Sequence, residues 1–477
     1  MRTGQALCGD MTISDSTGTD TRRPPVSRQP SASATRNRSG AALGVAMLGF
    51  FVVALDAQVV NVALPDIRAG LGGGLSGLQW VVTIYTLMFS ALLLCAGTVS
   101  DRVGARRAYG AGMGLFVVAS AACGLAPTLP VLIGTRLMQG LGAALITPTS
   151  LALIREAYDD PTRRARAIAL WAMGGSVAAA AGPVVGGALT QIDWRLIFFL
   201  NLPVGAAALA LLTRVARSPR RAHPFDWVGQ TSAVLALGAT TFAVIEGADQ
   251  GYGAPLIVTA MVVAAIAAVV FVHAQRRGRY PMVPPSLFRA PVVIVALVVA
   301  FVSMAAFYGV VFVQSLYFQQ QRGASALATG LLFLPMTGLV AALNPLVARI
   351  AERYGRLVPI IGGQLALVTG LVLLAVQSPH APLWLIAAVM VPIGVGGSFT
   401  VPPITSLLLD AVPAHATGTA SGVLNTARQL GGSLGVAVFG AIVAVAPEFQ
   451  TGLRIDLLAA AVLLAAATAA TVRWHRS

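Results

Sequence analysis

Asp56 places a carboxylate inside an apolar run that is long enough to cross a bilayer. A carboxylate in a hydrocarbon layer is costly unless it is protonated, paired or in contact with water. Burial disfavours the charged form, so such an acid can load a proton on one side of a membrane and release it on the other. We favour this proton-coupling role. A fixed salt bridge or neutral hydrogen bond and direct contact with a cationic substrate are the alternatives.

Arg136 lies several residues inside another apolar run, at a depth similar to that of Asp56. A guanidinium stays charged and must find a carboxylate, backbone carbonyls or water. An arginine that pairs with Asp56 in one conformation and leaves it in another would form a coupling switch. A structural tie between two helices is the alternative. Arg428 is a second such charge, which either faces an internal cavity or extends to the cytosolic interface.

The composition is that of an integral membrane protein. Hydrophobic residues make up 56% and charged residues 10% of the chain, and mean hydropathy is +0.79, whereas a soluble chain has about 25% charged residues. The net charge of +15 comes from arginines between the apolar runs, so we expect contact with anionic membrane lipids and no nucleic-acid partner. The three cysteines are too few and too scattered for a disulfide framework or a metal site.

Apolar segments of about 20 residues recur along the chain, the length that a helix needs to cross a hydrocarbon core of about 30 Å. We therefore predict an all-α integral membrane fold with fourteen transmembrane helices. The predicted spans are 43–65, 79–99, 108–126, 129–153, 167–190, 194–213, 227–246, 254–273, 291–317, 327–349, 357–376, 383–409, 419–446 and 453–472. Arginines concentrate in alternate loops, so the positive-inside rule predicts that both termini are cytosolic.

A short internal repeat divides the chain into halves. Ser100–Gly104 and Ala351–Gly355 both contain acid, Arg, an apolar residue and Gly in succession, 251 residues apart. Such repeats are common in secondary transporters, whose substrate site lies between the repeats near the membrane midplane. We predict a disordered cytosolic tail at 1–42, six-helix halves at 43–213 and 291–477, and two inserted helices within 214–290.

The same offset bears on the location of the proton site. The position equivalent to Asp56 in the second half is Phe307, and the position equivalent to Arg136 is Ala387. The second half therefore has neither the acid nor the arginine. We also place Asp56 as the only acid in the middle of a span. Proton coupling is therefore expected in the first half alone.

Five segments resemble motifs of the fourteen-span drug:proton antiporters of the major facilitator superfamily, in the same order and on the matching spans. They are the first-span signature at Leu55–Pro65, the loop 2–3 motif at Gly97–Arg107, R-x-x-Q-G-x-G at Arg136–Gly142, G-P-x-x-G-G at Gly182–Gly187, and the entry to the sixth span at Trp194–Gly205. The resemblance covers about residues 43–470. Gln58 replaces the usual Thr and Ala178 the usual Gly, which bears on substrate preference.

The resemblance implies a monomeric, proton-coupled exporter of lipophilic drugs or antibiotics in the inner (cytoplasmic) membrane. Such a protein needs no cofactor beyond the proton motive force. The loop 2–3 motif is then a gate latch, formed by Asp101, Arg102, Gly104, Arg106 and Arg107 and repeated more weakly by Glu352 and Arg353. The fifth-span motif is a hinge or leak seal, formed by Gly182, Pro183, Gly186 and Gly187. Plain membrane topology and ordinary small-residue packing are the alternative interpretations.

Polar and aromatic residues inside the spans are candidates for the substrate cavity. They are Gln58, Asn61, Tyr85, Phe307, Gln314, Tyr317, Asn344, Asn425 and Arg428. Each could instead form a hydrogen bond between packed helices.

The sequence does not favour an enzyme. It contains no Walker loop, nucleophile elbow or metal-ligand cluster, and no segment outside the spans is large enough to bind ATP. We expect the partners to be a lipophilic small molecule, protons and membrane lipids. Two other functions remain: a dedicated exporter of one metabolite or small polar solute with the same fold, and a membrane receptor without transport activity.

Overall fold

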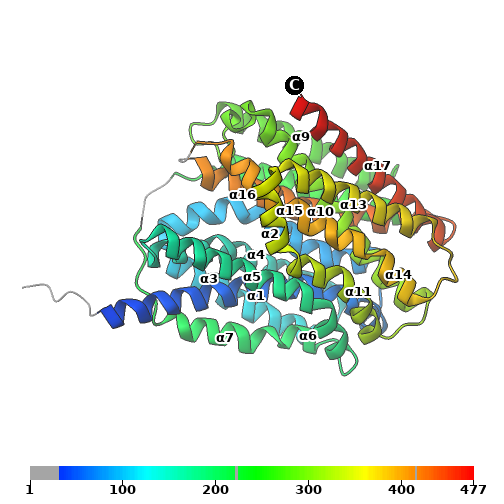
Figure 1. The fold of residues 1–477 in the computed structure, drawn as a ribbon. Coiled ribbons are helices and arrows are strands. Elements are labelled where there is room, and N and C mark those ends of the chain that lie inside the picture. Colours follow the sequence, from blue (N-terminus) through cyan, green and yellow to red (C-terminus); the bar gives the residue numbers. More distant parts are fainter. Residues whose placement is uncertain (1–31, 221–223, 414–415, 477) are drawn as a thin grey trace, which may run out of the picture.

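The computed structural model describes residues 32–220, 224–413 and 416–476, in which the chain forms helices and no strand (Figure 1). The elements are α1 (Ala32–Leu71), α2 (Leu75–Val103), α3 (Ala105–Gly124), α4 (Leu129–Ala157), α5 (Pro161–Thr190), α6 (Leu196–Phe199), α7 (Asn201–Leu212), α8 (Trp227–Gln250), α9 (Pro255–Arg277), η1 (Pro285–Arg289), α10 (Pro291–Leu316), η2 (Tyr317–Gln321), α11 (Ala326–Ala342), α12 (Asn344–Tyr354), α13 (Leu357–Val376), α14 (Leu383–Val389), α15 (Val391–Asp410), α16 (Thr417–Val445) and α17 (Phe449–Arg476). The chain is therefore an all-helical, multi-pass membrane protein.

Twelve helices in the described part of the chain are long and apolar enough to cross a membrane, which does not confirm the predicted count of fourteen. The two remaining predicted spans correspond to α3 and to the α6–α7 segment. Helix α3 begins with Arg106 and Arg107 and is rich in Gly and Ala, so its apolar stretch is weaker. The sixth predicted span forms only the shorter apolar segment Leu196–Leu212.

The first helix is longer than the sequence predicts. Helix α1 begins at Ala32, so the part of the expected disordered tail from residue 32 to 42 is helical. Alanines near this end, together with the adjoining apolar span, extend the helical hydrogen-bond ladder toward the N-terminus. The rest of the predicted tail, residues 1–31, lies outside the described residues.

Two glycines give the internal repeat a structural counterpart. Gly104 between α2 and α3 has φ +91°, and Gly355 between α12 and α13 has φ +86°. This backbone conformation suits glycine because a Cβ atom would be strained there. We call the end of the molecule that carries these two loops the basic end. The end that carries Gly72–Gly74 and residues 322–325 is the opposite end.

Helices from the two parts of the chain form adjoining groups in Figure 1, blue to green for α1–α7 and yellow to red for α11–α17. Helix α5 packs against α11, and α2 packs against α16. Helices α8 and α9 pack on each other, and α8 contacts both α2 and α16. The Trp80 indole N–H donates to Glu246 Oε1 at 2.8 Å, which ties α8 to α2.

The hydrophobic core is continuous at one end only. At the opposite end, a single cluster contains Val59 and Ile67 of α1 together with Val310 and Phe312 of α10 and Leu457 of α17. At the basic end the two groups have separate clusters, one built from α1–α4 and α7 and one from α10, α13, α15, α16 and neighbouring segments. The two groups of helices are thus joined by apolar packing at the opposite end.

Candidate functional site

Asp56 and Arg136 form an ion pair in the interior of the first group of helices. Arg136 Nη1 donates to Asp56 Oδ2, and the side chains of Asp56 and Arg136 are 0% and 1% exposed. Asp56 comes from the middle of α1, and Arg136 from the second turn of α4. The two groups selected from the sequence therefore meet, although they are separated by 80 positions in the chain.

Two amide side chains complete the hydrogen bonds of the carboxylate. Asp56 Oδ1 accepts from Gln139 Nε2 at 2.8 Å and from Asn201 Nδ2 at 2.7 Å. Both amides also donate to Ser120 Oγ, at 3.2 and 2.9 Å. The Ser120 hydroxyl itself donates to the Phe198 carbonyl at 2.9 Å. Ionised carboxylates accept hydrogen bonds and donate none, so this arrangement suits the charged form of Asp56.

Arg136 has further partners that do not depend on Asp56. Its Nη1 also donates to Gln139 Oε1 at 2.8 Å, and its Nε donates to the Val81 carbonyl at 3.1 Å. The guanidinium carbon lies 4.2 Å from the centre of the Tyr85 ring, a cation–π distance. The Tyr85 hydroxyl donates to the Val53 carbonyl at 3.1 Å. The guanidinium would therefore keep neighbours if Asp56 became neutral.

Sequence reasoning missed three members of this network, Ser120, Gln139 and Asn201. Gln139 lies one helical turn after Arg136 and belongs to the same R-x-x-Q-G-x-G segment, and Asn201 belongs to the motif at the entry to the sixth span. Both motifs were recognised, but the polar residue in each was not assigned a contact. The signal for Gln139 was its i, i+3 spacing from Arg136, which places both side chains on one helix face. Ser120 carried no sequence signal of its own.

The glycines of the fifth-span motif lie where α5 meets α1 and α11. A Cβ atom on Gly182 would lie 2.5 Å from the Gln58 Cβ, and one on Gly186 would lie 2.7 Å from the Val59 carbonyl oxygen. A Cβ on Gly187 would lie 2.4 Å from the carbonyl oxygen of Ala326 in α11. Gly330 of α11 approaches α5 in the same way, because its Cβ would lie 2.2 Å from the Pro183 carbonyl oxygen. This motif thus allows close backbone contact between the two groups of helices.

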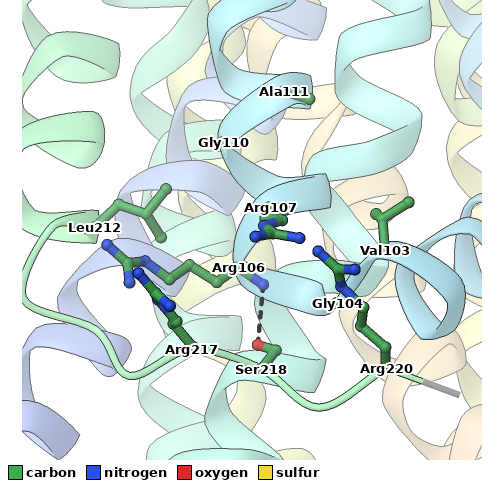
Figure 2. A pocket seen from close by; sticks show the side chains of 10 residues that line it. All are labelled: Val103, Gly104, Arg106, Arg107, Gly110, Ala111, Leu212, Arg217, Ser218 and Arg220. Carbon is green, nitrogen blue, oxygen red and sulfur yellow. Dashed lines mark hydrogen bonds between the residues drawn. The ribbon is translucent and has the colours of Figure 1, made fainter.

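The loop 2–3 motif is held by the segment that follows α7, residues 213–220, which we call the 213–220 linker. The Arg106 amide donates to Ser218 Oγ at 3.0 Å (Figure 2). The Ser218 hydroxyl donates to Glu156 Oε2 at 2.5 Å. Asp101 is exposed, and neither of the two ion pairs found among the described residues includes it. The expected pairing of Asp101 with arginines is therefore absent from this arrangement.

The equivalent loop of the second half differs in its charge contacts. Glu352 and Arg353 are both exposed, and the Arg353 guanidinium lies 5.4 Å from the Tyr354 ring centre. The ion pair at this loop joins Arg356 to Asp410 at the end of α15. The latch residues predicted for the second half thus differ from the residues that form its ion pair.

The candidates for the substrate cavity do not form a single group. Tyr85 belongs to the Arg136 network, and Gln58 packs against the fifth-span motif. Tyr317 is near the opposite end, where its hydroxyl donates to the Pro379 carbonyl at 3.3 Å. Asn344 lies 18 residues beyond the start of α11, roughly 27 Å along the span toward the basic end. Tyr317 and Asn344 therefore lie far apart along the spans, and their role in a substrate cavity stays a prediction.

Four of the remaining candidates are buried or half-buried amide or aromatic groups. Buried Asn61 donates through Nδ2 to the Ala57 carbonyl at 3.1 Å, and its Oδ1 has no hydrogen-bond partner. Gln314 is buried and its Oε1 also lacks a partner. Phe307 packs edge-on against Tyr308 with ring centres 5.8 Å apart, and Asn425 accepts from Arg428. The amide oxygens of Asn61 and Gln314 are therefore buried acceptors without a hydrogen-bond partner among the described residues.

Arg428 does not join Asp56. Its Nη1 donates to Asn425 Oδ1 at 3.3 Å, and its Nε lacks a hydrogen-bond partner. The side chain is half-buried in α16. The intramembrane arginines are therefore separate, and only Arg136 contacts the acid.

Asp456 is a second acid inside an apolar helix, nearer the end of its span than Asp56 is. It lies in the second turn of α17, its side chain is 1% exposed, and neither carboxylate oxygen has a hydrogen-bond partner. It is the fourth residue of the last predicted span, 453–472, and the sequence pattern alone does not indicate its burial. Helix α17 packs against α10, α13 and α16, and this packing buries the carboxylate.

Similarity to known proteins agrees with this geometry. The family model for the Major Facilitator Superfamily matches residues 46–436. Multidrug resistance protein Stp of Mycobacterium tuberculosis is 39% identical over 400 residues, which cover 83% of this chain and 74% of that protein. Methylenomycin A resistance protein of Bacillus subtilis is 36% identical over 412 residues, covering 86% of this chain and 88% of that protein.

A solved structure supports the fold. The crystal structure of peptide transporter POT superposes with a TM-score of 0.68 at 17% identity, covering 92% of this chain and 98% of that one. At this level of identity the likeness bears on the fold alone. The extent of the family match and the identity to Stp place the chain in a family: it belongs to the Major Facilitator Superfamily.

Proposed function

We propose that this protein is a proton-coupled exporter of lipophilic drugs or antibiotics across the cytoplasmic membrane. The observation that carries the proposal is the Asp56–Arg136 pair, which is buried and fully hydrogen-bonded within a transporter fold. Relatives named as a multidrug resistance protein and a methylenomycin A resistance protein support export as the direction of transport. The energy source would be the proton gradient, without a cofactor.

The proposed topology completes the membrane arrangement. Helix α3 and the α6–α7 segment would also cross the bilayer, since α3 packs against α4 and α7 within the first group of helices. This gives fourteen spans, with both termini and the basic end in the cytosol by the positive-inside rule. A monomer is sufficient, because the proton site is built from one chain.

The apolar packing at the opposite end supports an inward-facing state, given the proposed orientation of the basic end. Here Asp56 is paired and charged, having released its proton to the cytosol. Rocking of the two halves would open the opposite end and separate Asp56 from Arg136. Asp56 would then take up a proton from outside while the substrate leaves, and Arg136 would keep Gln139 and the Val81 carbonyl as partners.

The test is proton-driven efflux in inverted membrane vesicles that contain the Asp56→Asn variant. An amide cannot exchange the proton, so we expect loss of the pH-gradient-dependent flux with wild-type levels of protein in the membrane. Substrate exchange without a gradient should persist, because it does not require net proton movement. Undiminished gradient-driven efflux by this variant would refute the role of Asp56.

A narrower function is the second candidate. A relative at 36% identity is named for resistance to one antibiotic, methylenomycin A, which favours a dedicated exporter of one compound. Competition by chemically unlike compounds separates the two. Inhibition of efflux by many such compounds indicates a multidrug exporter, and inhibition by close analogues alone indicates a dedicated one.

A further inference from the structure

We propose that the cavity between the start of α3 and the 213–220 linker binds the head group of an anionic phospholipid. The cavity has a volume of about 770 Å³ and lies at the basic end of the molecule. Figure 2 shows four arginines that line it, Arg106 and Arg107 from α3 and Arg217 and Arg220 from the linker. No Asp or Glu is among the described residues of its lining.

The four guanidinium groups lack carboxylate partners. Neither ion pair among residues 32–220, 224–413 and 416–476 includes any of them. Arg106 Nη2 donates to the Thr213 carbonyl at 3.3 Å, an uncharged partner. The nearest carboxylate with a hydrogen bond to the site is that of Glu156, which accepts from Ser218. The lining thus carries four arginines, with one carboxylate hydrogen-bonded at its edge, and a phosphate group complements this excess of positive charge.

The backbone of this region positions the arginines. Gly104 turns the chain with φ +91°, and a Cβ atom there would lie 3.1 Å from the Ser218 carbonyl oxygen. Val215 is buried in the core of the first group of helices, which anchors the linker beneath α3. The arginines of α3 and of the linker are thus held on facing walls of one cavity.

The surface above the cavity favours a lipid over a soluble phosphate compound. Val103, Gly110 and Ala111 add apolar walls to the charged lining. Continuing along α3 from Ala111, Val118 is 68% exposed. Ala111 and Val118 are seven residues apart, about two helical turns, so they lie on one face of α3. An acyl chain can therefore follow this face from the cavity into the bilayer. A head group at the basic end and chains along α3 match the orientation of a lipid in the cytosolic leaflet.

Lipid binding is measured on the purified full-length protein in detergent. Short-chain phosphatidylglycerol, phosphatidylcholine with the same chains, and inorganic phosphate are added separately, and thermal unfolding and native mass spectrometry report binding. The test variant is Arg217→Gln with Arg220→Gln, two exposed linker residues. The matched control is Arg276→Gln with Arg277→Gln, which removes equal charge from the exposed end of α9.

We expect phosphatidylglycerol to raise the unfolding temperature and phosphatidylcholine to leave it unchanged. The linker variant should bind phosphatidylglycerol about 10- to 30-fold more weakly, since each arginine near a membrane surface contributes about 1 kcal/mol. The α9 control should bind like the wild type. Equal weakening in both variants, or no weakening in the linker variant, would overturn the site. Equal stabilisation by inorganic phosphate would overturn the assignment to a lipid. None of these readings requires transport, so they are independent of the proposed export function.

Discussion

At the residue scale, Asp56 is distinguished by the number of donors around one carboxylate. Arg136, Gln139 and Asn201 approach it from two other helices, and no part of its side chain is exposed. A substrate cannot reach an acid enclosed in this way without first displacing these donors. This enclosure disfavours direct contact of Asp56 with a cationic substrate in this arrangement, and it is compatible with the proposed proton-coupling role.

Removing one amide donor should weaken the proton site without abolishing the ion pair. In Asn201→Ala, Asp56 Oδ1 keeps only Gln139 as a donor. A hydrogen bond to a charged group contributes about 1.5–3 kcal/mol, so we expect gradient-driven efflux to fall by at least about tenfold. Efflux in vesicles at matched protein levels measures this. Gln250→Ala removes an exposed amide of α8 and should keep normal efflux, and equal loss in both variants would contradict the assignment.

Asp456 has the opposite surroundings, because no donor meets its buried carboxylate. Burial of an unpaired charge is so unfavourable that such a group takes its neutral form. We expect Asp456→Asn to retain efflux, in contrast to Asp56→Asn. Asp456→Leu should raise the free energy of unfolding by about 1 kcal/mol or more, measured by thermal unfolding in detergent. Loss of gradient-driven efflux in Asp456→Asn would show instead that this acid exchanges a proton during transport.

The sequence alone identified Asp56 and Arg136 because burial of a charged side chain has a large free-energy cost. An acid or an arginine inside an apolar run stands out because the membrane makes it costly. Gln139 and Asn201 carry a much smaller penalty, and many buried amides serve only packing. Their contact with Asp56 depends on how α4 and α7 are rotated about their axes, which the local pattern does not determine.

At the element scale, α5 is the helix that contacts both groups. Its small residues face α1 through Gly182 and Gly186 and face α11 through Gly187. Small residues allow helix backbones to approach closely in a membrane, where dispersion contacts replace the hydrophobic effect as the source of association. A leak seal of this kind depends on shape, so a single methyl group should disturb it.

The Gly187→Ala substitution tests this seal. The added Cβ would meet the Ala326 carbonyl oxygen at 2.4 Å and the Leu327 Cα at 2.8 Å, so α5 and α11 must move apart. Overpacking of this kind costs typically about 1–3 kcal/mol. We expect faster passive proton leakage into vesicles, measured with a pH-sensitive dye, and a lower unfolding temperature. Gly238→Ala in α8, where nothing lies within 4 Å of the added atom, should change neither property.

Element boundaries show where sequence patterns stop being informative. The apolar periodicity located every long helix, but it placed the start of α1 near residue 43 instead of at Ala32. It also missed the break between α11 and α12, where Asn344 and Pro345 begin a new helix. Helix ends depend on capping and on tertiary contacts, and these are set by neighbours distant in the chain.

At the scale of the whole molecule, hydrogen bonds as well as apolar contacts connect the two groups of helices at the opposite end. Gln191 at the end of α5 donates to Ser325 Oγ before α11 at 3.4 Å. Gln79 of α2 donates to the Ala437 carbonyl of α16 at 2.7 Å. These contacts must separate if the protein is to open at that end, as the proposed transport cycle requires.

A cross-link across this end should therefore stop transport. Gln191→Cys with Ser325→Cys places two thiols at contacting positions that are exposed, in a background where Cys8, Cys95 and Cys123 are replaced. A short thiol-reactive cross-linker should abolish efflux, and cleavage of its reducible bridge should restore it. Either single-cysteine variant should transport normally after the same treatment. Full efflux by the cross-linked pair would mean that this end does not open.

The apolar cluster shared by α1, α10 and α17 also makes the conformational equilibrium depend on temperature. Opening that end exposes apolar side chains to water, and such exposure increases heat capacity. Hydrophobic contacts weaken on cooling. Cooling should consequently shift the resting population toward the form open at that end, so the number of molecules ready to accept a proton from outside depends on temperature as well as on the gradient.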